Sequence, residues 1–105
     1  MMCDLMWSDP MKDDDASHGT WEFNKSRECS HMFGRKPIKE LLKNNNLLSV
    51  FRGHQVQQDG FRMHKWGGAN AFPNVITVFS APNYCGTYNN RAAVLCLEDN
   101  NLQIK

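Results

Sequence analysis

Residues 75–85 have the sequence Val-Ile-Thr-Val-Phe-Ser-Ala-Pro-Asn-Tyr-Cys, and this stretch decides how the chain folds. Four apolar residues around one threonine at 75–79 predict a buried β-strand. Proline has no N–H for a strand ladder, so the strand must end near Pro82 and the chain must turn there. We therefore expect Asn83, Tyr84 and Cys85 at the rim of a sheet, where α/β folds usually carry their chemistry.

The rest of the chain predicts one helix and several strands. Pro37, with apolar residues behind it at i, i+3, i+4 spacing, predicts an amphipathic helix over about 37–43 that the asparagine run at 44–46 ends. The polar stretch at about 11–24 predicts a loop. Further strands are expected at 47–51, 61–66, 92–97 and 102–104, with a hairpin turn at 98–101. One clear helix with four to five strands favours the α+β or α/β class.

Size and composition limit the function classes. A length of 105 residues suits one small domain. A net charge of +1 gives no electrostatic case for nucleic acid or an anionic membrane as a partner, and no stretch is long enough for a membrane-spanning helix. The four cysteines are scattered, and a chain with 41% hydrophobic residues does not need disulfides. We therefore expect reduced thiols and a location in the cytoplasm or nucleus.

Two residues have the chemistry of a phosphate or metal site. His54 follows a predicted strand and the small residue Gly53, and a neutral imidazole is a good ligand for zinc, iron or manganese. Arg27 carries a guanidinium, whose paired donors match two phosphoryl oxygens. By residue type alone, the commoner role of either side chain is a surface or core position.

Cys85 and Arg91 have the Cys-x5-Arg spacing of cysteine-dependent phosphatases, in which one loop holds a thiolate nucleophile and a phosphate-binding arginine. Three features oppose this interpretation. No histidine precedes the cysteine, two asparagines stand at 89–90 where glycine and a helix start are expected, and 92–97 predicts a strand. A cysteine mechanism is therefore the weaker alternative.

Five segments, in order, resemble one family. Val-Phe-Ser-Ala-Pro-Asn-Tyr-Cys at 78–85 resembles a signature of the metal-dependent serine/threonine protein phosphatases, the family that includes calcineurin. The other four are Cys-Asp-Leu-Met-Trp-Ser-Asp-Pro at 3–10, Asn-Lys-Ser-Arg with Cys-Ser and Phe-Gly at 24–34, Leu-Leu-Ser-Val-Phe-Arg-Gly-His-Gln-Val with Asp-Gly-Phe at 47–61, and Asn-Asn-Arg-Ala-Ala-Val-Leu at 89–95. The resemblance covers nearly the whole chain and is strongest to the calcineurin-like branch.

The resemblance implies a role for three matched positions in catalysis. His54 matches a ligand of the family's dinuclear metal centre. Arg27 matches the arginine that holds the substrate phosphate. Tyr84 matches a tyrosine whose hydroxyl donates to a phosphate oxygen.

Other matched positions surround that site. Asp9 matches an acidic residue of the shell around it, with Trp7 beside Asp9, and Cys85 matches a residue at the rim that is not the nucleophile. Two positions depart from the family, since Glu28 stands where the family has Gly and Gly53 where it has Ala. The remaining histidines match no ligand and are expected to be structural or surface groups; they are His18, His31 and His64.

Several family motifs are missing from this sequence. The family's domain begins with Gly-Asp-x-His-Gly, Gly-Asp-x-x-Asp-Arg-Gly and Gly-Asn-His-Glu, and later carries a His-Gly-Gly segment. We therefore expect residues 1–105 to be a single partial domain, the C-terminal portion of a metallophosphoesterase β-sandwich with flanking helices. Only one ligand of the two divalent metal ions, manganese, iron or zinc, would then lie in this chain. Alone, the chain is expected to be inactive or nearly so.

The activity implied by the resemblance is hydrolysis of phosphoserine and phosphothreonine in proteins. Metal-bound hydroxide would attack phosphorus in line while arginines neutralise charge on the equatorial oxygens. Phosphoprotein substrates and regulatory subunits are the partners expected on this basis. A truncated, non-catalytic binding module is the second alternative, and the missing motifs are the argument for it.

Overall fold

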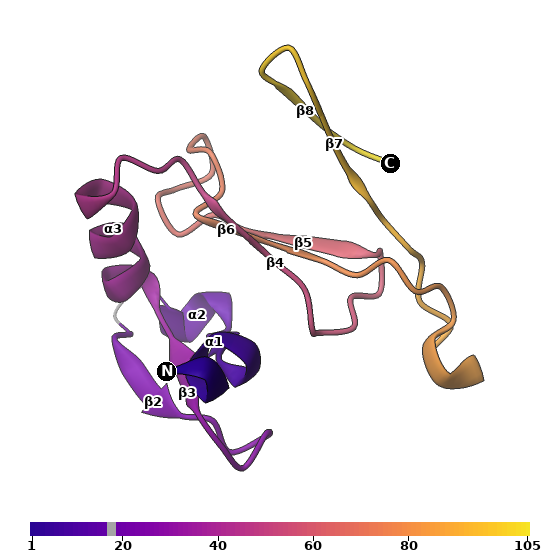
Figure 1. Cartoon of the computed structure of the whole chain (residues 1–105), viewed down its shortest axis with the longest axis horizontal. Helices are drawn as coiled ribbons and strands as arrows, with labels where there is room; N and C mark the ends of the chain where they lie inside the picture. The colour runs from indigo at the N-terminus through magenta and orange to yellow at the C-terminus, as the bar shows by residue number, and fades with distance from the viewer. Residues whose placement is uncertain (17–18) are drawn as a thin grey trace. The chain divides into compact units, whose positions relative to one another are not determined.

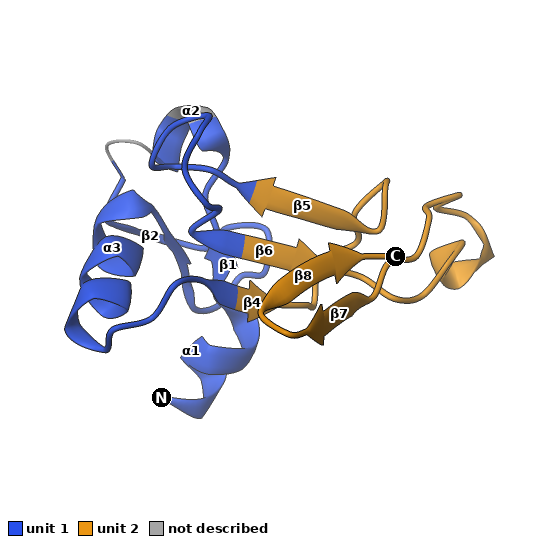
Figure 2. Ribbon diagram, turned by 90° about the horizontal axis from the view of Figure 1, so that it is seen from above, with its two compact units in different colours: residues 1–50, 64–75 blue, residues 51–63, 76–105 orange. Residues whose placement is uncertain are grey.

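The computed structural model describes residues 1–16 and 19–105 and contains helices and short strands in an α+β mixture (Figure 1). The chain divides into two compact units, one of residues 1–50 with 64–75 and one of residues 51–63 with 76–105 (Figure 2). Among the described residues there are eight strands, more than the four to five expected, because several are only two to four residues long. His18 lies outside the described residues.

A three-stranded sheet organises the first unit. Its strands β1 (Asp9–Pro10), β2 (Trp21–Phe23) and β3 (His31–Phe33) lie in the order β1-β3-β2. β1 runs parallel to β3, with Asp9 opposite Met32, and β2 runs antiparallel to β3. The β2–β3 connection, residues 24–30, therefore projects from the end of the sheet at which β1 begins.

Two short helices flank strand β1 in sequence, α1 (Met2–Trp7) and α2 (Asp13–Ala16). The prediction of a loop over 11–24 was wrong for α2 and β2. Composition misled here because most of the described polar side chains of this stretch face solvent, whereas Met11 and Ala16 are buried in the core.

Helix α3 (Arg35–Asn44) confirms the predicted amphipathic helix and begins two residues earlier than Pro37. The first four N–H groups of a helix have no partner within it, so proline is tolerated throughout the first turn. Ile38 and Leu42 are its buried residues. The helix ends at the asparagine run, where the Asn45 side-chain amide donates to the Leu41 carbonyl at 2.9 Å.

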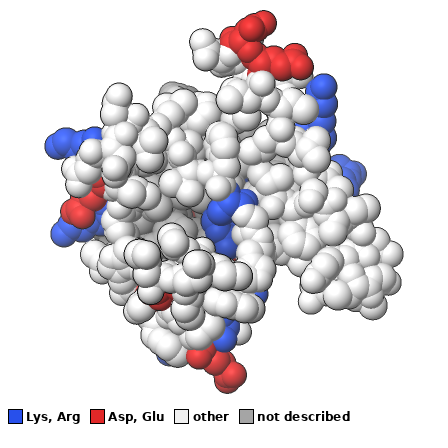
Figure 3. Space-filling model, in the orientation of Figure 1, with Lys and Arg blue, Asp and Glu red and all other residues white. Residues whose placement is uncertain are grey.

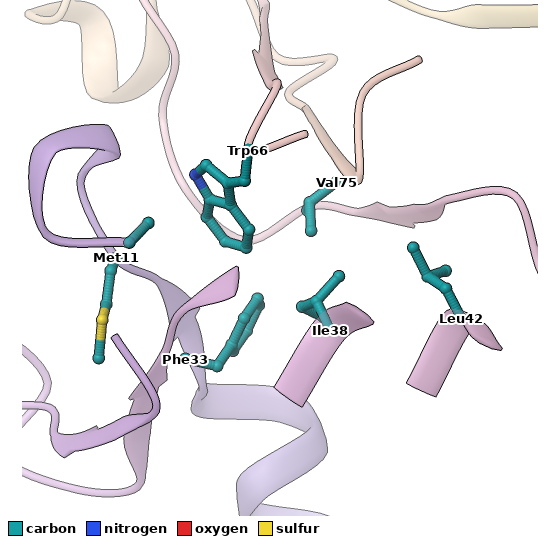
Figure 4. Packing of buried hydrophobic residues seen from close by; sticks show 7 residues of the cluster. Met11, Phe33, Ile38, Leu42, Trp66 and Val75 are labelled. Carbon is teal, nitrogen blue, oxygen red and sulfur yellow. The ribbon is translucent and has the colours of Figure 1, made fainter. Parts of the chain in front are cut away.

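The apolar core of the first unit joins α3 to the sheet and to the segment 64–75. Figure 4 shows Phe33 pointing toward Trp66 and Ile38, and the Phe33 and Trp66 rings meet edge to face with centroids 6.4 Å apart. The buried cluster consists of Met11, Ala16, Phe33, Ile38, Leu42, Trp66 and Val75. His64 is also buried, and its ring lies 5.5 Å from that of Trp66. The expectation that His64 is a structural residue agrees with this position.

A second sheet has the strand order β4-β6-β5, from β4 (Val50–Arg52), β6 (Val75–Val78) and β5 (Phe61–His64). The central strand β6 is the one predicted from residues 75–79, and its first three residues are fully buried. The prediction of a buried strand at this position is confirmed. The chain leaves β6 after Val78 and turns at residues 82–83, in agreement with Pro82 as the point of the turn.

The C-terminal hairpin pairs β7 (Leu95–Glu98) with β8 (Asn101–Ile104) in antiparallel register. The turn residues Asp99 and Asn100 have φ values of 47° and 64°, as a two-residue type I′ hairpin requires. The predicted strand over 92–97 begins only at Leu95. Before it, the Ala93 N–H donates to the Phe79 carbonyl at 3.1 Å, so this part of the chain pairs with other partners.

Within residues 1–16 and 19–105, none of the helices combines the length and apolar composition needed to cross a bilayer. Figure 3 shows basic and acidic side chains in small separate groups on the visible face, with uncharged surface between them. This distribution agrees with a net charge of +1.

Two glycines make a matched test of the backbone packing. A Cβ at Gly34 would overlap the Gly19 carbonyl oxygen and lie 2.5 Å from its carbonyl carbon, whereas a Cβ at Gly53 would meet only the Val78 oxygen at 3.4 Å. We predict that Gly34→Ala lowers the free energy of unfolding by about 1–3 kcal/mol through overpacking. Gly53→Ala should change it by less than about 0.5 kcal/mol. Urea denaturation of both variants measures the difference, and equal effects would contradict the packing described.

Candidate functional site

A buried carboxylate and an arginine form the centre of the candidate site in the first unit. Nε of Arg27 donates to Oδ2 of Asp9 at 2.9 Å, and Nη2 approaches Oδ1 at 3.5 Å. Asp9 is only 3% exposed, so its charge must be met by protein donors rather than by water. The two residues that the sequence placed in the phosphate site and its shell are therefore direct partners.

Asn24 is the third member of this site, and the sequence analysis did not identify it. Its side-chain amide donates to Oδ2 of Asp9 at 2.9 Å and to the Trp7 carbonyl at 3.4 Å. Its own side-chain oxygen accepts the Arg27 backbone N–H at 3.2 Å. Asn24 is fully buried and thus connects β1 to the loop 24–30. The available signal was its place in the Asn-Lys-Ser-Arg motif, since asparagine often bonds nearby backbone in a turn.

Trp7 lies against the arginine, whose guanidinium carbon is 5.7 Å from the centroid of the indole ring. The hydrogen bond to Asp9 raises the pKa of Arg27 above its ordinary value, against a smaller opposing effect of partial burial. Arg27 therefore remains a cation at any working pH. The structure thus brings together three of the six residues that the sequence assigned to the site, namely Trp7, Asp9 and Arg27.

The backbone of the loop 24–30 holds this arrangement in a tight turn. Glu28 and Ser30 have φ values of 55° and 58°, in the left-handed region that glycine adopts most easily. The Asn24 N–H donates to the Ser30 carbonyl at 3.1 Å and closes the loop. Glu28 stands where the resembling family has Gly, so the structure gives a conformational reason for glycine at that position.

Helix α1 is attached to the same loop by polar contacts. The Ser30 hydroxyl donates to Oδ1 of Asp4 at 2.9 Å, and Ser8 and Ser30 share a hydroxyl–hydroxyl hydrogen bond of 2.8 Å. Nδ1 of His31 lies 3.5 Å from the same Asp4 oxygen. The hydrogen bond from Ser30 lowers the pKa of Asp4. His31 is therefore a surface residue with a structural contact, as expected.

We predict that Asp9→Ala destabilises the chain by about 3 kcal/mol, the lower end of the range for breaking a buried ion pair, because Arg27 keeps some access to water. Asp9→Asn should cost less, since the amide oxygen still accepts from Asn24 or Arg27. Glu22→Ala, an exposed change on β2, serves as the matched control. Chemical denaturation of the three variants should rank them in this order, and an Asp9→Ala protein as stable as Glu22→Ala would contradict the role given to Asp9.

In the second unit, a second buried amide shapes the loop that carries Tyr84. Asn90 is 4% exposed, and its side-chain amide donates to the carbonyls of Ala81 and Arg91, both at 2.9 Å. Its side-chain oxygen accepts the Tyr84 N–H at 2.9 Å. The Asn90 carbonyl in turn accepts the Asn83 N–H at 2.9 Å. The sequence did not identify Asn90, although it lies in the matched Asn-Asn-Arg motif.

Tyr84 and Cys85 lie in this loop, which follows strand β6 in the chain. They belong to the 3-10 turn η1 (Tyr84–Gly86), and both side chains are exposed. The Tyr84 ring meets Phe79 edge to face with centroids 5.1 Å apart and lies 6.0 Å from Tyr88. Its orientation is thus set by aromatic neighbours on both sides.

The geometry around Cys85 lacks the features of a cysteine nucleophile loop. Cys85 has φ 55°, and only the single turn η1 surrounds it. No helix begins at Arg91, which leads through an irregular stretch into β7. A cysteine-dependent site uses a following helix N-terminus to stabilise the thiolate and phosphate. The Cys-x5-Arg spacing therefore lacks its structural context here.

His54 is exposed directly after β4 and has φ 73°. Across the described part of the chain, no group of three or more His, Cys, Asp and Glu side chains is arranged to hold a metal ion. The role of His54 as a metal ligand therefore stays a prediction from the sequence. A shallow hollow of about 420 Å³ adjoins Gly53 and is lined by Phe51, Arg52, Gly53, Val78, Ser80, Ala93, Val94 and Leu95.

We predict that Asn90→Ala loosens the loop 81–91 and lowers the free energy of unfolding by about 1–3 kcal/mol, because backbone groups lose their partner. Thr87→Ala, an exposed change in the same loop, is the control. Hydrogen exchange at the Tyr84 amide should accelerate in Asn90→Ala alone. Equal exchange rates in the two variants would show that Asn90 does not hold the loop.

Comparison with known proteins finds relatives of one class. The chain is 45% identical over its whole length to the serine/threonine-protein phosphatase 2B catalytic subunit A1 of Saccharomyces cerevisiae, and 34% identical to subunit A2 of the same organism. It is 39% identical over 99% of its length to the putative serine/threonine-protein phosphatase C06A1.3 of Caenorhabditis elegans. Over its full length the chain is thus homologous to serine/threonine-protein phosphatases. No family model matches it.

A solved structure supports the same assignment. The protein serine/threonine phosphatase of Saccharomyces cerevisiae with similarity to human phosphatase PP5 matches 96% of the chain with a TM-score of 0.72 and 29% identity. This likeness confirms the fold class predicted from the sequence. The chain spans 21%, 22% and 25% of the three curated relatives and 31% of the solved chain. The similarity is therefore to one segment of each of these proteins.

Proposed function

We propose that this chain supplies part of the active site of a protein serine/threonine phosphatase, with Arg27 as its phosphate-binding residue. The observation that carries the proposal is the Asp9–Arg27 pair, in a chain homologous to such phosphatases over its full length. A guanidinium fixed by a buried carboxylate is preorganised, so it needs little rearrangement when a phosphate arrives. Its five N–H donors allow it to serve Asp9 and a phosphate at the same time.

The surroundings of Arg27 support this role. Asn24 fixes the backbone at Arg27 as well as the Asp9 carboxylate, so both ends of the arginine are positioned by one buried residue. The ring of Trp7 lies beside the guanidinium. In the proposed reaction Arg27 neutralises charge on the equatorial phosphoryl oxygens, which grows as the serine or threonine oxygen leaves.

Tyr84 and His54 are given roles by their match to family motifs. We assign the Tyr84 hydroxyl to a phosphate oxygen, and its exposed position at the end of η1 is compatible with contact to a substrate. We assign His54 as one ligand of a dinuclear centre of manganese, iron or zinc. Such a centre lowers the pKa of a bound water, and its other ligands would come from outside the described residues.

The substrates we propose are phosphoserine and phosphothreonine in proteins, and regulatory subunits are the partners proposed for the whole enzyme. Because this segment spans about a fifth to a quarter of its curated relatives, we propose that it is inactive or nearly so by itself. The cytoplasm or nucleus remains the proposed location, on the expectation of reduced cysteines.

A chimera tests this function. We predict that replacing the matching segment of the yeast phosphatase 2B catalytic subunit A1 by this chain preserves metal-dependent hydrolysis of a phosphopeptide. In the chimera, Arg27→Ala or His54→Ala should lower kcat by about 10²–10³-fold, the usual effect of losing one charge-stabilising donor or ligand from a preorganised site. Lys25→Ala, two residues from Arg27, is the matched control and should keep the parent rate.

Two further variants separate the alternatives. Cys85→Ser should keep most of the activity, because metal-bound hydroxide and not sulfur is the nucleophile proposed. Glu28→Gly should match or exceed the starting rate, since it restores the family residue at a left-handed position. The cysteine mechanism would be supported if Cys85→Ser abolishes turnover while a chelator leaves the activity of the parent chimera unchanged. A folded chimera without any turnover would instead favour the non-catalytic binding module.

A further inference from the structure

A polar network in the second unit joins the residues on either side of the turn that carries His54, and the reaction proposed above uses none of its members. Nη1 of Arg52, the last residue of β4, donates to Oε1 of Gln55 at 2.7 Å and to Oγ1 of Thr77 at 3.3 Å. Thr77 is fully buried in the central strand β6, whereas Arg52 and Gln55 are partly buried. The arginine thus connects the residue after His54 to the centre of the sheet.

The backbone between Arg52 and Gln55 needs such a support. His54 has φ 73°, in the left-handed region, and its side chain is exposed. A non-glycine residue keeps this conformation only where the surrounding structure holds it there. The hydrogen bond from Arg52 to Gln55 closes the turn across His54, and its charged donor makes it stronger than a bond between neutral groups.

We propose that Arg52 is a positioning residue for His54, because it holds the turn 53–55 and so fixes the direction in which the imidazole leaves the end of β4. Arg52 acts through the turn and not on the substrate. Its effect on catalysis rests on the function proposed for His54 in phosphate hydrolysis, whereas its hold on the turn does not. The two are therefore tested by separate measurements.

The far end of the same segment has anchors of its own. The Gln58 side-chain amide donates to the Asn89 carbonyl at 3.1 Å, and the Gln58 carbonyl accepts the Arg91 N–H at 2.9 Å. Gln58 therefore stays attached to the loop 81–91 when the guanidinium is removed. Loss of the guanidinium should free the turn 53–55 alone.

Backbone dynamics of the full chain, measured by NMR relaxation, test the hold on the turn. In Arg52→Ala the order parameter of the His54 and Gln55 amides should fall from about 0.85, typical of rigid backbone, to below about 0.6. The order parameter at Gln58 should stay at its parent value. Arg62→Ala, which changes an exposed arginine on β5 of the same sheet, is the matched control and should alter neither value.

Two changes at Gln55 test the acceptor and provide a refutation even if Arg52→Ala does not fold. Gln55→Leu removes the acceptor and should lower the order parameter at His54 in the same way. Gln55→Glu keeps an acceptor for the guanidinium and should leave His54 ordered. The proposal is overturned if His54 stays ordered in both Arg52→Ala and Gln55→Leu, or if Gln55→Glu and Gln55→Leu loosen it equally.

The consequence for catalysis is measured in the chimera with the yeast phosphatase. Arg52→Ala and Gln55→Leu should each lower kcat by about 10–100-fold, the usual loss when a residue that orients a ligand is removed. KM for the phosphopeptide should stay close to the parent value, because Arg27 and not His54 is the residue proposed to hold the phosphate. Arg62→Ala should keep the parent rate.

The outcomes separate this inference from the proposed function. A turn that loosens in the full chain without any fall in kcat of the chimera would overturn the positioning role of Arg52. A folded chimera that has no turnover even with Arg52 present would instead refute the proposed function, and the order parameters would still decide whether Arg52 holds the turn.

Discussion

Burial of the Asp9 carboxylate is the constraint on which the first unit depends. A charge that is 3% exposed costs several kcal/mol unless protein donors replace water. Asn24 and Arg27 provide those donors from the loop 24–30, so satisfying one carboxylate also fixes the β2–β3 connection against β1. Because Asp9 needs these donors, the position of Arg27 is fixed as well.

In the second unit, a neutral side chain provides the hydrogen-bond partners that an irregular loop needs. The loop 81–91 contains left-handed residues at Asn83, Cys85 and Asn89, and such a path leaves backbone groups without ladder partners. Asn90 supplies both donors and an acceptor from one buried amide, which alanine could not do. In both units an irregular, exposed loop with candidate functional residues is supported by one buried polar side chain. Rigid support beneath an exposed loop is what precise binding of a small anion requires.

Sequence patterns predicted the elements whose signal is local. Strand β6 follows from a continuous apolar run and helix α3 from the spacing of its apolar residues. The Asp99-Asn100 turn tolerates left-handed backbone. Each was therefore found within a few residues of its position. The strands β1 and β2 were not predicted, because two or three residues carry no period and their pairing with β3 is decided by tertiary contacts. Among site residues, motif resemblance selected Trp7, Asp9 and Arg27, and the structure joins them. Asn24 and Asn90 were not identified from the sequence. An asparagine in a solvated turn and one that supports a buried network give the same sequence signal.

Glu28 shows how a single departure from the family can be read in physical terms. The family places Gly at this position, and the structure gives Glu28 a φ of 55°, so glycine is the residue that the backbone itself favours. The strain of a non-glycine residue here is of order 1–2 kcal/mol, and it lies one peptide from Arg27. The loop nevertheless keeps the Asn24, Asp9 and Arg27 contacts in full. The buried network therefore holds the arginine despite the local backbone strain. Glycine would ease the backbone conformation at position 28, but the contacts among Asn24, Asp9 and Arg27 form without it.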